Sequence, residues 1–121
     1  VGAHVVRAYV EAGWKVTVFG PSLKPCLTEF DLAHISFHEG SVTRYDDINQ
    51  ALSKTRPELV VGLAAYGATG QGLLASAATN ETSALEINVN GFHNLLTACR
   101  RQGTPRVLWA STLAVFGNPT L

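Results

Sequence analysis

The sequence alternates between segments with helical periodicity and short segments rich in β-branched and aromatic residues. The helical segments are centred on 5–10, 46–55 and 82–102. The strand candidates are 14–19, 34–38, 59–65 and 106–111. Since strands joined by helical crossovers pair in parallel, we predict an α/β fold with a doubly wound parallel sheet.

Local signals indicate where these segments begin and end. Gly13 and Gly103 follow helical segments and are typical C-terminal caps. Thr43 and Asp46 have the spacing of a capping box at the start of the next helix. The segment 21–33 contains two prolines, so we expect it to be irregular.

The longest helical segment, 82–102, carries a row of large apolar residues on one side, as in an amphipathic helix. This row consists of Leu85, Val89, Phe92, Leu96 and Cys99. The tandem arginines at 100 and 101 stand near the helix C-terminus, where cations oppose the helix dipole.

Composition excludes several classes of function. A chain of 121 residues sets a prior of one domain at most. Nine basic residues balance nine acidic ones, and no basic cluster favours nucleic acid or an anionic membrane. The uncharged stretch 62–80 is rich in small and polar residues, so it does not resemble a bilayer span.

Cysteine and histidine usage favours a cytoplasmic protein without a metal. Cys26 and Cys99 lie far apart and form no CxxC, which argues against a disulfide framework and a zinc site. No charged region precedes an apolar run at the start, so no secretory signal is indicated. His34 and His38 point the same way along one strand candidate, but no third ligand accompanies them.

The ends of the sequence indicate a partial domain. No Met occurs anywhere, and the chain opens on Val1 and Gly2. The last residues, 118–121, follow an apolar run without a closing helix. We therefore expect 1–121 to be one partial domain of a longer protein, truncated at both ends.

Ligands of open parallel sheets bind beyond the carboxyl ends of the strands. Small residues occupy those ends here, at Gly20, in 38–42, in 63–66 and in 110–112. Small side chains let a flat ligand approach the backbone, but they also fill contacts between helices and sheet, so both interpretations stay open. Gly2, at the start of the first helix, permits either close packing or the approach of a phosphate.

Several short motifs, in this order and at this spacing, resemble those of a known family. They are GAHVVRA at 2–8, AGWKV at 12–16, GSVT at 40–43, LAA at 63–65, NVNGFHNLL at 88–96 and ASTLAVFG at 110–117. The last four are similar to the family patterns GDV-T, HLAA, NVxGTxNLL and SSxAVYG. Over essentially all its length the sequence resembles the NAD-dependent epimerase/dehydratases, which are extended short-chain dehydrogenase/reductases.

The resemblance implies a Rossmann-like domain that binds NAD or NADP, and it assigns cofactor-binding roles by position. Gly2 matches the last glycine of the pyrophosphate motif, and Gly20 stands where an acidic residue often binds the adenosine ribose. The other matched positions lie beside the adenine, along the dinucleotide or on the long helix. They are Ser41, Val42, Leu63, Ala64, Ala65 and Asn88. For Asn88 a structural role is the alternative, because a buried amide must be satisfied locally.

Thr112 is the catalytic candidate that the resemblance implies. It matches the hydroxyl that hydrogen-bonds the substrate oxygen which gains or loses a proton. Without the resemblance, a threonine capping the turn after the strand is the simpler interpretation. Its neighbour Ser111 would face the opposite way, since side chains alternate along a strand.

Two positions depart from the family pattern. Gly20 supplies no carboxylate against a ribose 2′-phosphate, and Lys24 is close in sequence, so both NAD and NADP stay open. The proton-transfer pair Tyr-x-x-x-Lys is absent, because none of Tyr9, Tyr45 and Tyr66 has a lysine four residues on. We expect the pair in the remainder of the protein, and this chain to be inactive alone.

The implied function is hydride transfer between NAD(P) and a small-molecule substrate, a nucleotide sugar in an epimerase or dehydratase. The alternatives are a hydroxysteroid-type dehydrogenase or reductase and a non-catalytic dinucleotide sensor on the same fold. The resemblance also implies a strand order of 3-2-1-4-5, with the first strand missing here, and a possible homodimer through the helix at 82–102.

Overall fold

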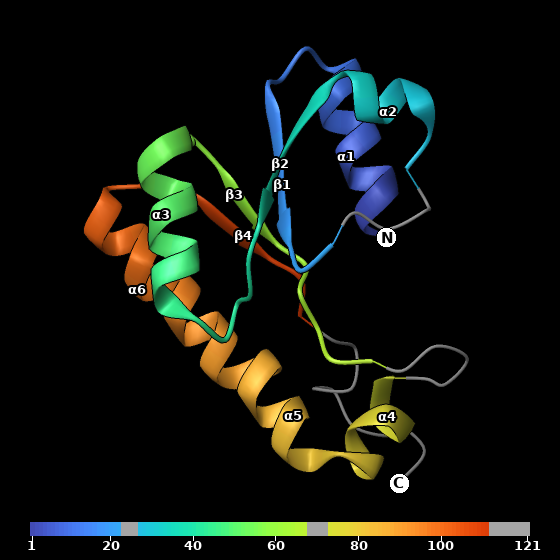
Figure 1. Cartoon of the computed structure of the whole chain (residues 1–121), viewed down its shortest axis with the longest axis vertical. Helices are drawn as coiled ribbons and strands as arrows, with labels where there is room; N and C mark the ends of the chain where they lie inside the picture. Colours follow the sequence, from blue (N-terminus) through green and yellow to red (C-terminus); the bar gives the residue numbers. More distant parts are fainter. Residues whose placement is uncertain (23–26, 68–72, 112–121) are drawn as a thin grey trace, which may run out of the picture.

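The computed structural model describes residues 1–22, 27–67 and 73–111. Helices and strands alternate along most of this chain (Figure 1). In order they are α1 (Gly2–Glu11), β1 (Val16–Gly20), α2 (Glu29–Ala33), β2 (Ile35–Glu39), α3 (Tyr45–Thr55), β3 (Val60–Gly62), α4 (Leu73–Thr79), α5 (Glu81–Leu85), the π-helical turn η1 (Glu86–Asn90), α6 (Gly91–Gln102) and β4 (Val107–Trp109).

The strands form two parallel pairs. β1 pairs with β2 from Val16 opposite Ile35 to Gly20 opposite Glu39. β3 pairs with β4 in a second sheet of two strands. The predicted α/β class with parallel strands is confirmed, and the two pairs correspond to the neighbours 2–3 and 4–5 of the expected order. No strand lies between β1 and β3 in the described residues.

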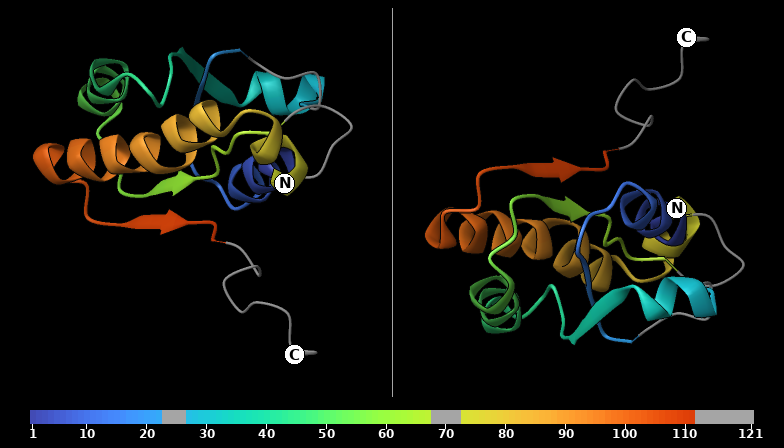
Figure 2. Two further views of the ribbon diagram at one scale, coloured as in Figure 1. Left: turned by 90° about the horizontal axis from the view of Figure 1, so that it is seen from below. Right: turned by 90° about the horizontal axis from the view of Figure 1, so that it is seen from above.

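The helices lie on both sides of the strands. Figure 1 shows α3 and α6 on one side, with α1 and α2 on the other. Both views of Figure 2 show α6 running alongside β3 and β4. The buried apolar cluster lies between α3 and α6 and consists of Ile48, Leu52, Ala98 and Cys99. Burial there raises the pKa of the Cys99 thiol.

The expectation of an irregular segment at 21–33 was wrong at its end, where α2 forms. Thr28 caps this helix in a full capping box: its hydroxyl accepts from the Asp31 N–H, and its own N–H donates to the Asp31 carboxylate. The signal was present in the sequence, since a threonine three residues before an acidic residue is one form of this motif. The prolines outweighed it in the prediction.

The capping box predicted at Thr43 and Asp46 was also wrong. Arg44 is the N-cap of α3, and it makes no side-chain capping bond. Asp47 instead accepts the Ser41 N–H at 2.8 Å, with one oxygen that also binds Arg44. The turn before α3 is therefore closed by the carboxylate of Asp47, one residue after the predicted Asp46.

The row of apolar residues on 82–102 is only partly buried, because Cys99 belongs to the buried cluster and Phe92 is half-buried. Leu85, Val89 and Leu96 are 60%, 56% and 42% exposed. The buried positions are small residues and a cysteine, at Ala84, Gly91, Ala98 and Cys99. The π-helical turn η1 contributes to this difference, because its extra residue rotates the helix faces that precede it.

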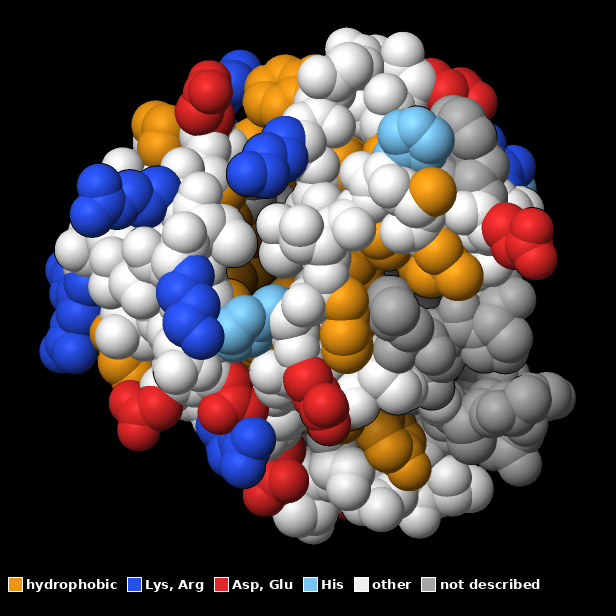
Figure 3. Space-filling model, turned by 45° about the horizontal axis from the view of Figure 1, so that its top comes forward, with side chains coloured by type: hydrophobic (Ala, Val, Ile, Leu, Met, Phe, Trp, Pro, Cys, Tyr) orange, Lys and Arg blue, Asp and Glu red, His pale blue; other side chains and the backbone are white. Residues whose placement is uncertain are grey.

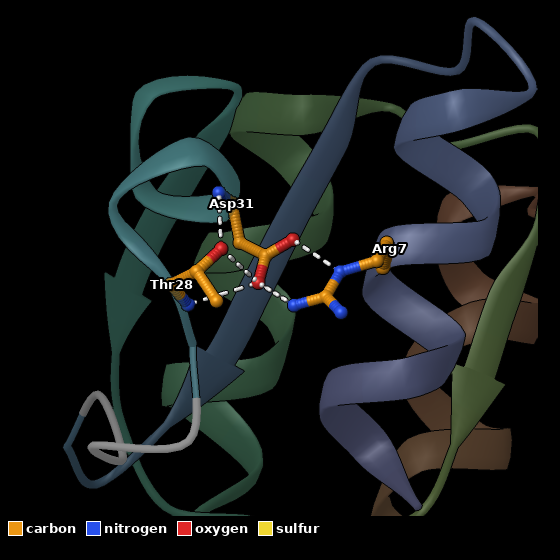
Figure 4. A network of polar contacts seen from close by, with 3 residues as sticks. All are labelled: Arg7, Thr28 and Asp31. Atoms are coloured by element: carbon orange, nitrogen blue, oxygen red, sulfur yellow. Dashed lines mark hydrogen bonds and ion pairs between the residues drawn. The ribbon is translucent and has the colours of Figure 1, made fainter.

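A polar network ties α1 to α2 (Figure 4). The Arg7 guanidinium donates to both Asp31 oxygens, at 3.2 and 2.8 Å, and the Thr28 hydroxyl donates to one of them at 2.8 Å. The Asp31 side chain is fully buried. Arg7 first, and then the Thr28 N–H, hold the pKa of Asp31 well below its usual range.

Candidate functional site

A cavity of about 1080 Å³ lies between the two strand pairs and extends to the carboxyl ends of β1 and β3. Its walls include apolar side chains of α1, β1, β3 and α6. We call it the main cavity. Most of the predicted cofactor-binding residues line it, namely Gly2, Gly20, Ser41, Val42, Leu63, Ala64 and Ala65. The fold thus brings these seven residues, which are far apart in the sequence, to the wall of the same cavity.

The N-terminus of α1 borders the main cavity through Val1, Gly2 and Ala3. Among the described residues no side chain caps this end, and the first turn of α1 holds no acidic residue. In the part of the chain that the structure describes, a Cβ on Gly2 would meet no heavy atom within 4 Å. The free N–H groups and the positive end of the helix dipole suit an anion.

The turn at Ser41 and Val42 is fixed from both sides. The Ser41 hydroxyl shares a 2.8 Å hydrogen bond with that of Thr43 and accepts the Thr43 N–H. The carbonyl of Val42 accepts from the Asn94 side chain at 3.1 Å. Val42 also packs against Gly91, where a Cβ would lie 2.8 Å from its Cγ2. Only a glycine lets α6 approach the turn this closely.

The segment after β3 is held by Asn88. The amide oxygen of Asn88, on η1, accepts the Tyr66 N–H at 2.8 Å. Asn88 is not among the described residues that line the main cavity. This contact supports the structural alternative for Asn88, because it positions the backbone that follows Leu63, Ala64 and Ala65. The cofactor-binding role of Asn88 stays a prediction.

A second, more open cavity of about 400 Å³ lies at the carboxyl ends of β1 and β2. It is lined by Pro21, Glu39, Gly40, Ser41 and Arg44. Sequence reasoning assigned no role to Glu39 or Arg44. Arg44 is ion-paired with Asp47, whose pKa is lowered first by the Ser41 N–H and then by Arg44. The signal available in the sequence was the position of Glu39, at the end of a strand candidate.

Several predicted residues cannot be placed. Thr112 and Lys24 lie outside the described residues. Ser111, beside Thr112, follows β4 and is exposed. The catalytic prediction for Thr112 therefore stays a prediction.

Residues 1–22, 27–67 and 73–111 contain neither a helix long and apolar enough to span a membrane nor a cluster of three potential metal ligands. On the face in Figure 3, basic and acidic side chains are interspersed, with apolar side chains visible in hollows between them. This distribution agrees with the balanced composition of the sequence.

Comparison with known proteins assigns the family. The family model described as "NAD dependent epimerase/dehydratase family" matches residues 1–121. The chain belongs to this family. One relative of this family member is short-chain dehydrogenase/reductase family 42E member 1 of Bos taurus, which is 34% identical over 101 residues. The alignment covers 76% of this chain but only 24% of that relative.

Solved structures of epimerases share the fold of this family member. UDP-glucose 4-epimerase from Brucella ovis, in complex with NAD, superimposes with a TM-score of 0.80 at 22% identity, over 99% of this chain and 35% of that one. UDP-glucose 4-epimerase from Thermotoga maritima, with UDP-glucose, gives a TM-score of 0.76 at 25% identity, over 92% of this chain and 34% of that one. The chain thus spans about a third of these enzymes.

Proposed function

We propose that this chain forms part of an NAD(P)-binding Rossmann-like domain in an enzyme that transfers hydride to and from a nucleotide sugar. The observation that carries the proposal is the main cavity, which joins the uncapped N-terminus of α1 to the carboxyl ends of β1 and β3. An extended ligand with an anionic centre and flat ends fits such a site. The bound dinucleotide would supply the hydride acceptor and donor.

The residues fit a dinucleotide laid across the strand ends. The amide end of α1 at Gly2 would hold the diphosphate. Gly20, Ser41 and Val42 would border the adenosine half, and the exposed small residues Ala64 and Ala65 the other half. Leu63, half-buried at the end of β3, would support the nicotinamide side. Thr112 would hydrogen-bond the reacting oxygen of the substrate.

The nucleotide sugar is proposed from the family and from the epimerases that share the fold. Two of those solved structures are UDP-glucose 4-epimerases, and one of them contains UDP-glucose. The bovine relative instead supports a second candidate, a dehydrogenase or reductase acting on another hydroxyl or ketone. Both candidates use the same cofactor site, so substrate profiling separates them.

The proposal includes the rest of the sheet and a partner. We propose that a parallel strand from elsewhere in the same protein lies between β1 and β3, whose facing edges are unpaired in the described residues. This strand would fill the part of the main cavity that separates β1 from β3, so that the dinucleotide occupies only the edge of the cavity at the carboxyl ends of the strands. We also propose a homodimer through the exposed row at Leu85, Val89 and Leu96. An apolar helix side of this kind is typical of a helix-packing interface. Without those parts and the Tyr-x-x-x-Lys pair, the chain alone would be inactive.

Titration of the full-length gene product with NADH and NADPH tests the proposal. We expect at least one of them to bind, and Gly2→Ala to weaken binding because its methyl group would enter the main cavity at the amide end of α1. Thermal melting of Gly2→Ala checks that the fold is kept, which is expected because its Cβ meets no heavy atom of the described residues within 4 Å and alanine is the better helix former.

Ala8→Ser is the matched control, because Ala8 lies on the same helix and is exposed but does not line the main cavity. Its affinity for either cofactor should equal that of the wild type. Absence of binding by the wild-type protein to both cofactors would refute the proposal.

Full-length Thr112→Val tests the catalytic step separately. Turnover should fall strongly, because valine removes the hydroxyl at nearly constant volume, while the cofactor affinity stays near that of the wild type. Unchanged turnover would remove Thr112 from the catalytic machinery and leave the cofactor site intact.

A further inference from the structure

The second cavity brings together the ends of two neighbouring strands. Gly20 is the last residue of β1 and Glu39 the last of β2, and they are register partners in the parallel pair. The Gly40 N–H donates to the Gly20 carbonyl at 3.0 Å, so the pairing continues to the very end of both strands. Register partners in a parallel pair lie about 5 Å apart and project to the same face of the sheet.

Gly20 leaves space on that face. A Cβ built on Gly20 would meet no heavy atom within 4 Å. Pro21, the next residue, lines the second cavity together with Glu39. The position from which an acidic side chain commonly binds an adenosine ribose is therefore open, and a carboxylate stands on the adjacent strand.

Glu39 has a carboxylate free to bind a ligand. The side chain is exposed, and among the described residues it takes part in no hydrogen bond or salt bridge. A glutamate is long enough to bridge the spacing between neighbouring strands. Its carboxylate can thus reach the space over Gly20 and accept a hydrogen bond there.

The other charges round the second cavity do not favour a phosphate. Arg44 is its one described cationic lining residue, and Arg44 Nη2 lies 2.6 Å from Asp47 Oδ2. The same Asp47 oxygen also accepts the Ser41 N–H, which fixes the pair in place. With Arg44 neutralised by Asp47, the Glu39 carboxylate is the unbalanced charge.

We propose that Glu39 selects NAD over NADP by accepting the hydrogen bond of the adenosine ribose 2′-hydroxyl, in place of the side chain that Gly20 lacks. This inference rests on the proposed dinucleotide site. A ribose hydroxyl can donate to the carboxylate, whereas a 2′-phosphate would meet a like charge and leave both groups poorly solvated. Gly20 alone left both cofactors open, and its register partner decides between them.

Dissociation constants of NADH and NADPH for the full-length gene product test this inference. The wild type should bind NADH at least about tenfold more tightly than NADPH, the ratio expected for one hydrogen bond to a charged group. Glu39→Gln should bring the ratio of the NADPH and NADH dissociation constants close to one, chiefly because NADPH binds more tightly to the variant. Its melting temperature should stay unchanged, because the Glu39 carboxylate makes no contact to lose within the described residues.

Two further variants sharpen the test. Glu58→Gln removes an exposed carboxylate that lines neither cavity, so its ratio should equal that of the wild type. The double variant Gly20→Asp with Glu39→Gln should again prefer NADH, because the new carboxylate on β1 replaces the one lost from β2. A wild type that prefers NADPH, or a ratio unchanged in Glu39→Gln, would overturn the role of Glu39 while leaving the dinucleotide site standing. Failure to bind either cofactor would defeat the proposed function itself.

Discussion

The region from α1 to β2 and the region from α3 to β4 build similar parallel units with different stabilising interactions. The second region contains the buried apolar cluster of Ile48, Leu52, Ala98 and Cys99. In the first region α1 has no buried residue, and among the side chains that the structure describes there Asp31 is the fully buried one. One unit is therefore held mainly by apolar packing between two helices, and the other by an ion pair and a capping box.

The two regions differ in the packing partners of their helices. α3 and α6 pack on each other, and the small residue Ala98 lets them approach. α1 packs on β1 and α2, while its apolar side chains at Val5 and Val6 border the main cavity. In the first region the ion pair of Arg7 and Asp31 links α1 to α2, where no described apolar side chain is fully buried.

The largest expected effect is in the apolar region. Ile48→Ala removes a side chain that is almost completely buried between α3 and α6. It should lower the free energy of unfolding by about 2–5 kcal/mol, as other large-to-small core substitutions do. Urea denaturation of the full-length gene product measures this loss. Val6→Ala in α1 should lower the free energy of unfolding by less. An equal loss in the two variants would contradict the contrast between the regions.

The polar region should show the next largest effect, as a dependence on pH. The pKa of Asp31 is lowered in the folded state, so its contribution to stability is full above the unfolded value of about 4 and is lost as the pH falls below it. Asp31→Asn should be less stable at pH 7 and lose less on acidification than the wild type. Denaturation midpoints at pH 7 and in the acid range compare the two proteins. Parallel profiles would show that Asp31 does not carry the acid sensitivity.

The junction between the regions should give a smaller effect of unusual sign. Alanine normally stabilises a helix relative to glycine, but a Cβ on Gly91 would lie 2.8 Å from Val42 Cγ2. Gly91→Ala should therefore lower the free energy of unfolding by about 1–3 kcal/mol through overpacking. The double variant with Val42→Ala should recover part of that loss. A stabilised Gly91→Ala protein would mean that Val42 moves aside freely.

The smallest effect is expected at Asn88. Asn88→Ala removes the acceptor of the Tyr66 N–H and should cost about 1 kcal/mol, the usual net value of such a hydrogen bond. Leu96→Ala, an exposed position on the same long helix, is the comparison. Loss of cofactor binding in Asn88→Ala without loss of stability would support the predicted cofactor-binding role of Asn88. Cofactor titration alongside thermal melting distinguishes the two outcomes.

Much of the fold followed from local pattern, whereas the site residues were predicted from the resemblance to the family. The four strand candidates and the helix at Tyr45–Thr55 appear where periodicity placed them, with strand ends shifted by a few residues. α2 was missed because the prolines of 21–33 concealed its capping box. Seven of the predicted cofactor positions line one cavity because they occupy equivalent ends of parallel elements.

The sequence by itself determined the element types, the parallel α/β class and the family, because periodicity, turn residues and motif order are local properties of the chain. Only the tertiary structure decided which side of the long helix is buried, since the π-helical turn and the approach of Gly91 to Val42 depend on packing. It also decided that Asn88 binds the Tyr66 backbone and that Glu39 stands beside Gly20. Such pairings join residues distant in the chain, and no local pattern encodes their register.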